Sequence, residues 1–267
     1  MPRVVSGMAS TCRVVARSVA LFAVLAAAQA DFLWRRLRAS APLTGQSRAI
    51  WMQRWVRVVL RVFGVTCSMV GPIPTDSLVV SNHLGYLDIL VLITAHAAVF
   101  VSKQEIKQWP VFGWLARSAG TIFVERRTRD DLPAVTAAMV EVLREGQSVV
   151  LFPEGTSSSG EGVLPFHAAL FEAAVQARVP VTPVYLRYTT PQGQPEPKAY
   201  YWGDAILMPH ILRLFGTKSV CAEVYFSAEE KKFEDRHAAA TWAWGVIEDL
   251  RKEKTESQSR EVSRQLL

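Results

Sequence analysis

Residues 77–88 read SLVVSNHLGYLD, and the stretch LDILVLITAH follows over residues 87–96. The first run is short and apolar, which predicts a buried strand, and the second predicts a helix. A strand that leads directly into a helix is typical of α/β proteins, in which reactive side chains gather where strands end. His83 and Asp88 flank this turn. Because histidine can accept a proton from a hydroxyl near neutral pH and a carboxylate can orient its ring, the pair is a candidate for acid–base catalysis.

The spacing of His83 and Asp88 sets a condition on the local geometry. On a continuous helix, five residues would turn the two side chains about 140° apart, so they could not share one face. They can meet only across a turn, and Gly85 between them is the residue that bends a backbone most easily. We therefore expect His83 in the turn and Asp88 near the start of the helix.

From Gly71 onward, short apolar runs alternate with helical stretches. We expect strands at 77–82, 99–102, 121–125, 148–152, 181–188 and 219–226, and helices near 87–97, 110–118, 131–145, 167–177 and 236–254. This order predicts an α/β fold with a mixed, largely parallel sheet flanked by helices. The proline-rich residues 190–200 predict a surface loop, and the polar residues after 254 predict a frayed tail.

The positive charge of the chain is concentrated at its N-terminal end. The net charge is +6, but residues 1–64 hold ten arginines and a single acidic residue, Asp31, which gives +9. The other 203 residues carry a net charge of −3. A basic segment of this kind suits either nucleic acid or anionic lipid head groups.

Two apolar segments within the basic region favour lipid and argue against nucleic acid. Residues 18–34 form an apolar stretch of about 17 residues, which is the lower limit for a membrane-spanning helix. In residues 50–65, Arg54, Arg57 and Arg61 share one helical face, while aliphatic side chains and tryptophans occupy the rest. This second pattern is typical of a helix that lies in a membrane interface.

These segments divide the chain into three parts. We expect a two-helix membrane anchor over residues 1–70, an α/β domain over 71–254 and a polar tail over 255–267. Two alternatives stay open. The first segment could be a signal peptide cleaved after Ala28-Gln29-Ala30, and the second could be an ordinary helix packed on the domain core.

A second candidate motif is the run FPEGTSS over residues 152–158. It leaves a predicted strand in a turn, where Glu154, Gly155 and Thr156 offer a carboxylate, an approachable backbone and a hydroxyl. Such a turn can hold a polyol or a phosphate, although the residues also suit a simple turn.

Two further runs complete the set of motifs. GTIFVERR, over residues 120–127, ends in Arg126 and Arg127, whose guanidinium groups match phosphate geometry; a solvated surface pair is the ordinary alternative. VPVTPVY, over residues 179–185, is apolar and broken by proline. Because proline cannot join a central ladder, we expect this strand at the edge of the sheet or in the wall of a groove.

In their order and spacing, the four motifs resemble those of the glycerolipid (lysophospholipid) acyltransferase family, typified by the 1-acylglycerol-3-phosphate acyltransferases. The matching residues are Asn82, His83 and Asp88; Gly120, Ile122, Phe123 and Arg126 or Arg127; Phe152, Pro153, Glu154, Gly155 and Thr156; and Val181 and Pro183.

The resemblance implies direct transfer of a fatty acyl group from acyl-CoA or acyl-carrier protein to the free hydroxyl of a lysolipid. His83 would be the general base and Asp88 its orienting partner. The acceptor would be bound by Asn82, Arg126, Arg127, Glu154, Gly155 and Thr156, and the acyl-donor groove would include Val181 and Pro183. The resemblance implies no metal and no bound cofactor. It also implies a place at the inner (cytoplasmic) membrane, with the catalytic domain facing the cytosol.

The chain departs from the family pattern at two positions. Many family members that act on lysophosphatidic acid have arginine directly after the Glu-Gly-Thr of the third motif and lysine a little further on. Here these positions are Ser157 and His167. Both changes remove cationic donors, each worth roughly 1.5–3 kcal/mol to a bound phosphate. We therefore expect an acceptor without a terminal phosphomonoester, such as a lyso-ornithine lipid or another lysophospholipid, with lysophosphatidic acid as the alternative.

Rival functions receive less support from the sequence. A serine hydrolase would need a G-x-S-x-G run, and a nucleotide-binding enzyme would need a complete glycine-rich loop; neither is present. The three cysteines, Cys12, Cys67 and Cys221, form no disulfide or zinc-binding pattern. A non-catalytic lipid-binding membrane protein remains an alternative, against which the intact His83–Asp88 pair argues.

Overall fold

The structure is a computed structural model that describes residues 2–40, 44–95, 98–103, 113, 121–124 and 132–265. Its helices are α1 (Pro2–Arg38), α2 (Gly45–Phe63), α3 (Tyr86–Ala95), α5 (Leu132–Arg144), α6 (Glu172–Ala177), α7 (Leu207–Gly216) and α8 (Arg236–Gln265), with 3₁₀ turns η3 (Ala168–Phe171) and η4 (Pro197–Ala199). Its strands are β1 (Val65–Val70), β2 (Leu78–Ser81), β3 (Val99–Lys103), β4 (Ile122–Val124), β5 (Val149–Leu151), β6 (Val181–Thr189) and β7 (Val220–Phe226).

The described strands form one sheet in the order β1-β7-β6-β2-β5-β3-β4. Every neighbouring pair is parallel except β6 and β7, which are antiparallel. The mixed, largely parallel sheet predicted from the sequence is therefore confirmed. The predicted strands and helices are found within a few residues of their expected bounds, with two exceptions. The helix expected at 236–254 continues to Gln265, and of the helix expected near 110–118 only residue 113 is among the described residues.

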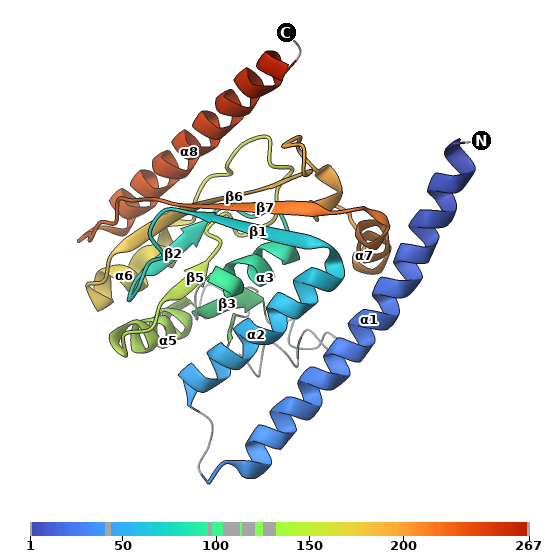
Figure 1. The fold of residues 1–267 in the computed structure, drawn as a ribbon. Helices are drawn as coiled ribbons and strands as arrows, with labels where there is room; N and C mark the ends of the chain where they lie inside the picture. Colours follow the sequence, from blue (N-terminus) through green and yellow to red (C-terminus); the bar gives the residue numbers. More distant parts are fainter. Residues whose placement is uncertain are drawn as a thin grey trace.

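Helices cover both faces of the sheet (Figure 1). Because side chains alternate between the two faces of a strand, the sheet supplies two separate cores. On one face, Val79, Val150 and Leu186 pack with residues of α1, α2, α3 and α7. On the other face, Leu78, Leu151 and Tyr185 pack with residues of α5, α6 and α8.

Helix α2 is part of the first core, which corrects its interpretation as an interfacial membrane helix. Its apolar face is buried against the sheet and α3, and the buried side chains are Trp51, Met52, Val56, Val59, Leu60 and Phe63. The side chains of Arg54, Arg57 and Arg61 lie on the exposed side. The alternative of an ordinary helix packed on the domain is therefore the observed one.

The predicted division at residue 71 is also wrong, because β1 (Val65–Val70) belongs to the sheet. It pairs in parallel with β7 along its whole length, from Val65 opposite Val220 to Val70 opposite Tyr225. At the other end of the chain, α8 continues to Gln265, so the expected frayed tail after residue 254 is helical. Helix α7 (Leu207–Gly216) was not expected from the sequence.

Helix α1 runs along the side of the domain (Figure 1). It is long and apolar enough over Met8–Arg38 to cross a membrane, by length and composition. It is nevertheless attached to the protein at both ends. Near its start, Arg13 and Arg17 donate hydrogen bonds to main-chain carbonyls at the end of α7, and near its end, Asp31 accepts a hydrogen bond from Trp55 of α2 at 2.8 Å.

Candidate active site

The turn between β2 and α3 brings His83 and Asp88 together. The Nδ1 atom of His83 lies 2.8 Å from Oδ2 of Asp88. Gly85 has a φ angle of 152°, which lets the chain turn sharply before α3 begins at Tyr86. Asp88 lies in the first turn of this helix, so the two side chains meet across the turn and not along one helix.

The carboxylate of Asp88 is fully buried and receives hydrogen bonds on both oxygens. Oδ2 accepts from the main-chain N–H groups of Leu84 and Gly85, at 2.6 and 2.9 Å, as well as from His83. Oδ1 accepts from the hydroxyl of Tyr188, at 2.7 Å. A buried carboxylate requires such donors, and here they fix its orientation toward the imidazole.

The ring of His83 is held so that one nitrogen faces outward. Its Nδ1–H donates to Asp88, which leaves Nε2 as the acceptor nitrogen. The ring stacks on Phe152, with centroids 4.2 Å apart and planes inclined by 19°. The His83 side chain keeps 20% of its surface exposed, so Nε2 can be reached from outside. The arrangement suits a general base.

Glu154 lies directly beside the turn and is buried. Its Oε1 atom accepts a hydrogen bond from the main-chain N–H of His83 at 3.0 Å. Burial raises the pKa of Glu154 to about 8, against the opposing effect of hydrogen-bond donors around it. Its other oxygen, Oε2, has no partner in hydrogen-bonding geometry among the described residues, and the main chain of Leu164 and the side chain of Ser158 lower the pKa of the carboxyl group in part.

Ser158, like Glu154, connects the loop of the third motif to the main chain of His83. The main-chain N–H and the hydroxyl of Ser158 both donate to the carbonyl of His83, at 2.8 and 3.3 Å. Gly155 adopts a positive φ of 73°, and Thr156 is exposed. Glu154, Gly155 and Thr156 therefore lie next to the His83–Asp88 pair. The contact made by Ser158 could not be predicted, because a serine in a turn has no pattern that points to a distant carbonyl.

The side chain of Asn82 is bound to the main chain of Leu186. Its amide nitrogen donates to the carbonyl of Leu186 at 2.9 Å, and its oxygen accepts from the N–H of Leu186 at 2.8 Å. The side chain thus continues the pairing of β2 with β6 beyond the end of β2, and it is buried. These bonds give Asn82 a structural role that the sequence did not suggest, and its expected contact with substrate remains a prediction.

The fourth motif is also placed differently from the prediction. Strand β6 lies between β7 and β2, so it is not an edge strand. Val181 is fully buried in the core shared with α5 and α8, and Pro183 is buried within the sheet. Pro183 has no N–H to donate, but it lies just beyond the end of the β6–β7 ladder, so no hydrogen bond of that ladder is lost. Its carbonyl still accepts a hydrogen bond from the main-chain N–H of Ser227. The predicted donor-groove role of these two residues is therefore not supported.

The remaining predicted residues fall into two groups. Arg126, Arg127 and Gly120 lie outside the described residues. His167 lies at the exposed start of η3, and its main-chain N–H donates to the carbonyl of Pro153. Within the described ranges, no group of three or more His, Cys, Asp or Glu side chains could hold a metal ion.

A buried histidine, His210, packs next to the turn between β2 and α3. His210 of α7 accepts from the hydroxyl of Tyr86 at Nδ1 (3.0 Å) and donates from Nε2 to the carbonyl of Tyr200 (2.9 Å). Burial lowers the pKa of His210, which favours this neutral form. Tyr201 contacts the His210 ring and packs over Gly85. Helix α7 and the loop before it therefore pack against the turn that holds His83 and Asp88.

Comparisons with known proteins identify the family of this chain. A family model described as "Acyltransferase" matches residues 65–187. The chain is 39% identical over 167 residues to a 1-acyl-sn-glycerol-3-phosphate acyltransferase of Neisseria gonorrhoeae, covering 62% of this chain and 65% of that one. It is 36% identical to a lyso-ornithine lipid O-acyltransferase of Rhodobacter capsulatus, covering 64% and 63%. The chain thus matches a little under two thirds of the length of these relatives.

Two further comparisons cover more of the chain, one in sequence and one in structure. A lyso-ornithine lipid O-acyltransferase of Pseudomonas aeruginosa is 32% identical over 207 residues, covering 76% of this chain and 79% of that one. The crystal structure of the 1-acyl-sn-glycerophosphate (LPA) acyltransferase of Thermotoga maritima has the same fold, with a TM-score of 0.64, 20% identity, and coverage of 95% of this chain and 97% of that one. The chain therefore belongs to the acyltransferase family that includes the 1-acyl-sn-glycerol-3-phosphate and lyso-ornithine lipid acyltransferases.

Proposed function

We propose that the protein is a membrane-associated O-acyltransferase that moves a fatty acyl group from acyl-CoA or acyl-carrier protein to the free hydroxyl of a lysolipid. The observation that carries this proposal is the His83–Asp88 pair, with Nδ1 bound to a buried carboxylate and the ring partly exposed. Membership of the acyltransferase family gives independent support.

The reaction needs one proton acceptor and no nucleophile from the enzyme. Nε2 of His83 takes the proton of the acceptor hydroxyl as its oxygen attacks the carbonyl carbon of the donor thioester. Asp88 stabilises the imidazolium that forms. When the carbon–sulfur bond breaks, the same proton passes to the leaving thiolate, so the imidazole is restored. General-base assistance of this kind contributes roughly 10²–10⁴-fold to the rate.

The acceptor head group would lie against the loop of the third motif. Thr156 is exposed next to the pair, and Glu154 has one oxygen that the main chain of His83 does not use. Because burial keeps much of Glu154 protonated at neutral pH, this oxygen can donate as well as accept a hydrogen bond. Arg126 and Arg127 remain proposed partners of a phosphate on sequence grounds.

Within this class, we propose a lyso-ornithine lipid or another lysophospholipid as acceptor. Ser157 and His167 support this choice, because neither supplies the permanent cation that would grip a phosphomonoester dianion. Lysophosphatidic acid is the alternative, since relatives of both kinds are similar to this chain. Purified protein should be assayed with radiolabelled acyl-CoA and both acceptors, with lipids separated by chromatography. A strong preference for lysophosphatidic acid would refute the proposed acceptor.

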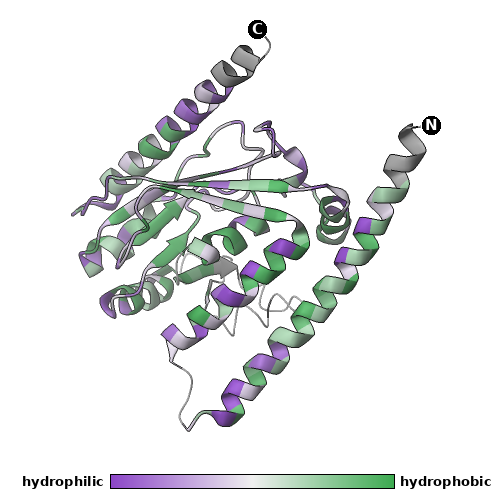
Figure 2. Ribbon diagram, viewed as in Figure 1, coloured by the Kyte–Doolittle hydropathy of each residue, from purple (hydrophilic) through white to green (hydrophobic). Residues whose placement is uncertain are grey.

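We also propose that α1 holds the protein at the cytoplasmic membrane, with the catalytic domain on the cytosolic side. Much of the α1 ribbon is hydrophobic (Figure 2), and the apolar side chains of Val19, Phe22 and Leu37 are exposed. Because α1 is attached to α7 and to α2, lipid can reach only its outer face, which favours a helix lying in one leaflet. Flotation with vesicles that contain anionic lipid tests this, and failure of the intact protein to float would refute it.

The decisive test of catalysis is His83→Ala. Acyl transfer should fall at least about 10²-fold, because the proton acceptor is lost, while vesicle flotation stays unchanged. His237→Ala, on the exposed start of α8, is the matched control and should retain activity. A non-catalytic lipid-binding protein predicts no acyl transfer in the wild type, and retained activity in His83→Ala would refute the proposed mechanism.

A further inference from the structure

The residue that completes the buried end of the His83–Asp88 pair is Tyr188, on β6. Its side chain is fully buried, and its hydroxyl donates to Oδ1 of Asp88 at 2.7 Å. The other oxygen of Asp88 is occupied by His83 and by two main-chain N–H groups. Among the described residues, Tyr188 is therefore the donor that holds the far oxygen of the carboxylate.

In its contact with Asp88, this hydroxyl acts as the donor at physiological pH. Burial and the adjacent charge of Asp88 raise the pKa of Tyr188 well above its ordinary value. The proton therefore stays on the phenol, and the bond is a charge-assisted hydrogen bond to the carboxylate. Removing it would leave Oδ1 buried without a partner, so the carboxylate that orients the imidazole would be held through Oδ2 alone.

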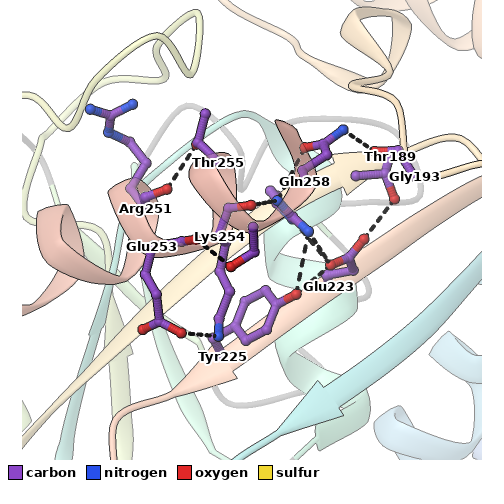
Figure 3. Close-up of polar contacts among 11 residues, drawn as sticks. Thr189, Gly193, Glu223, Tyr225, Arg251, Glu253, Lys254, Thr255 and Gln258 are labelled. Atoms are coloured by element: carbon purple, nitrogen blue, oxygen red, sulfur yellow. Dashed lines mark hydrogen bonds and ion pairs between the residues drawn. The ribbon is translucent and has the colours of Figure 1, made fainter. Parts of the chain in front are cut away.

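The strand that carries Tyr188 is fixed by a second set of contacts on the opposite face of the sheet. Side chains alternate along β6, so Arg187 and Thr189 point away from the pair. Arg187 binds Oε2 of Glu223 at 2.8 Å, and the hydroxyl of Thr189 donates to Oε1 of Glu223 at 2.8 Å (Figure 3). We call these three residues the rear clamp.

The rear clamp also attaches the C-terminal helix to the sheet. Arg187 donates to the carbonyl of Lys254 at 2.9 Å and to the side-chain oxygen of Gln258 at 3.3 Å, both on α8. Figure 3 shows Lys254 and Gln258 reaching toward the sheet from one side of this helix. The residues on both sides of Tyr188 are therefore anchored to β7, and one of them also to α8, which prevents β6 from shifting along the sheet.

We propose that Tyr188 is a positioning residue for the His83–Asp88 pair, and that the rear clamp fixes the strand from which it acts. The inference rests on the proposed function, because it assigns Tyr188 a role in that same reaction. Tyr188 does not contact the substrates; it holds the carboxylate that holds the imidazole.

The test is Tyr188→Phe, which removes one oxygen and keeps the ring. We expect kcat to fall about tenfold to a hundredfold with little change in KM, as for the loss of a hydrogen bond to a buried charge. Tyr185→Phe is the matched control. It makes the same change on the same strand, but its ring packs on the opposite face, against Tyr225. This control should keep wild-type kinetics.

The pH profile separates positioning from a general structural effect. Titratable groups around Asp88 are His83, Glu154, Tyr188 and Tyr200. Without the Tyr188 donor, more negative charge on Asp88 faces the imidazolium, so the acid limb of kcat should move to higher pH. A fluorinated tyrosine at position 188 keeps the side chain's size and donates more strongly, so it should move that limb to lower pH. It also serves if Tyr188→Phe folds poorly.

Each outcome supports or overturns the inference. Wild-type kcat and pH profile in Tyr188→Phe, or an equal loss in Tyr185→Phe, would overturn it. If His83→Ala abolishes transfer while Tyr188→Phe does not lower it, only the role of Tyr188 fails. If His83→Ala retains transfer, the proposed function itself fails, and the two failures are thus distinguishable.

Discussion

Replacing Asn82 by alanine distinguishes a structural amide from a substrate-binding one. The side chain makes two hydrogen bonds to the main chain of Leu186, at 2.9 and 2.8 Å, and both residues are buried. Alanine removes both bonds and leaves the N–H and the carbonyl of Leu186 without partners. Because Leu186 lies on β6 two residues before Tyr188, the change also loosens the strand beside the His83–Asp88 pair.

The magnitude follows from these two groups. A buried polar group left without a partner costs about 1–3 kcal/mol, so the free energy of unfolding should fall by roughly 2–6 kcal/mol. The whole protein has a stability of about 5–15 kcal/mol, which makes this a large share. At roughly 2–4 °C for each kcal/mol in a chain of this size, the melting temperature should drop by about 10 °C.

The assay pairs thermal unfolding with steady-state kinetics in detergent micelles. Asn82→Ala should melt at a markedly lower temperature and show a lower kcat, with the acceptor KM little changed below its melting transition. Thr156→Ala, at an exposed position of the neighbouring loop, is the control. It should melt like the wild type and raise the acceptor KM. If Asn82→Ala melts within about 2 °C of the wild type and mainly raises KM, the structural reading of Asn82 is refuted.

Two further predictions concern charge. Because the pKa of Glu154 is raised from 4.5 to about 8, the folded protein binds this proton more tightly than the unfolded chain; the stabilisation is present below about pH 4.5 and is lost as the pH rises through 8. Glu154→Gln cannot titrate. Between about pH 5 and pH 9, the free energy of unfolding of this variant, measured in urea, should therefore rise relative to that of the wild type by at most about 5 kcal/mol. A difference in free energy between the two proteins that does not change with pH would contradict this. The double variant Arg13→Ala and Arg17→Ala removes the donors to the carbonyls at the end of α7, so stability should fall by about 1.5–3 kcal/mol and limited proteolysis should release α1 early. Arg35→Ala on the same helix, where the exposed pair with Asp31 contributes little, is the control, and equal protease resistance in all three proteins would count against the attachment.

Much of the fold could be predicted because the sheet leaves a clear pattern in the sequence. Strands β2 and β5 are short, mostly apolar runs, and β6 is buried along most of its length, since both faces of this part of the sheet are covered. The meeting of His83 and Asp88 across a bend also followed from their spacing and from Gly85. These features depend on local geometry, which sequence spacing determines directly.

The errors have a common physical origin, because they concern what an element contacts. An amphipathic helix looks the same whether its apolar face meets lipid or a protein core, so α2 was assigned to the wrong partner. The amide of Asn82 suits a substrate as well as the main chain of Leu186. Helix α7 could not be recognised in the sequence, because Ile206 provides no side-chain cap and Pro209 lies close to its start.

The pairing of β1 with β7 has a consequence for folding during synthesis on the ribosome. These strands are about 155 positions apart in the chain, and α1 is attached to α7, which comes just before β7. At a synthesis rate of about 5–20 residues per second, roughly 8–30 s pass between the synthesis of β1 and that of its partner β7, and α1 is exposed for a similar time before α7 is made. During that interval, the face of α1 that will contact α7 and the edge of β1 that will pair with β7 have no partner. The nascent chain therefore has to be sheltered by lipid or by a chaperone, and ribosomes stalled before residue 207 should carry a chain that is prone to aggregate when neither is present.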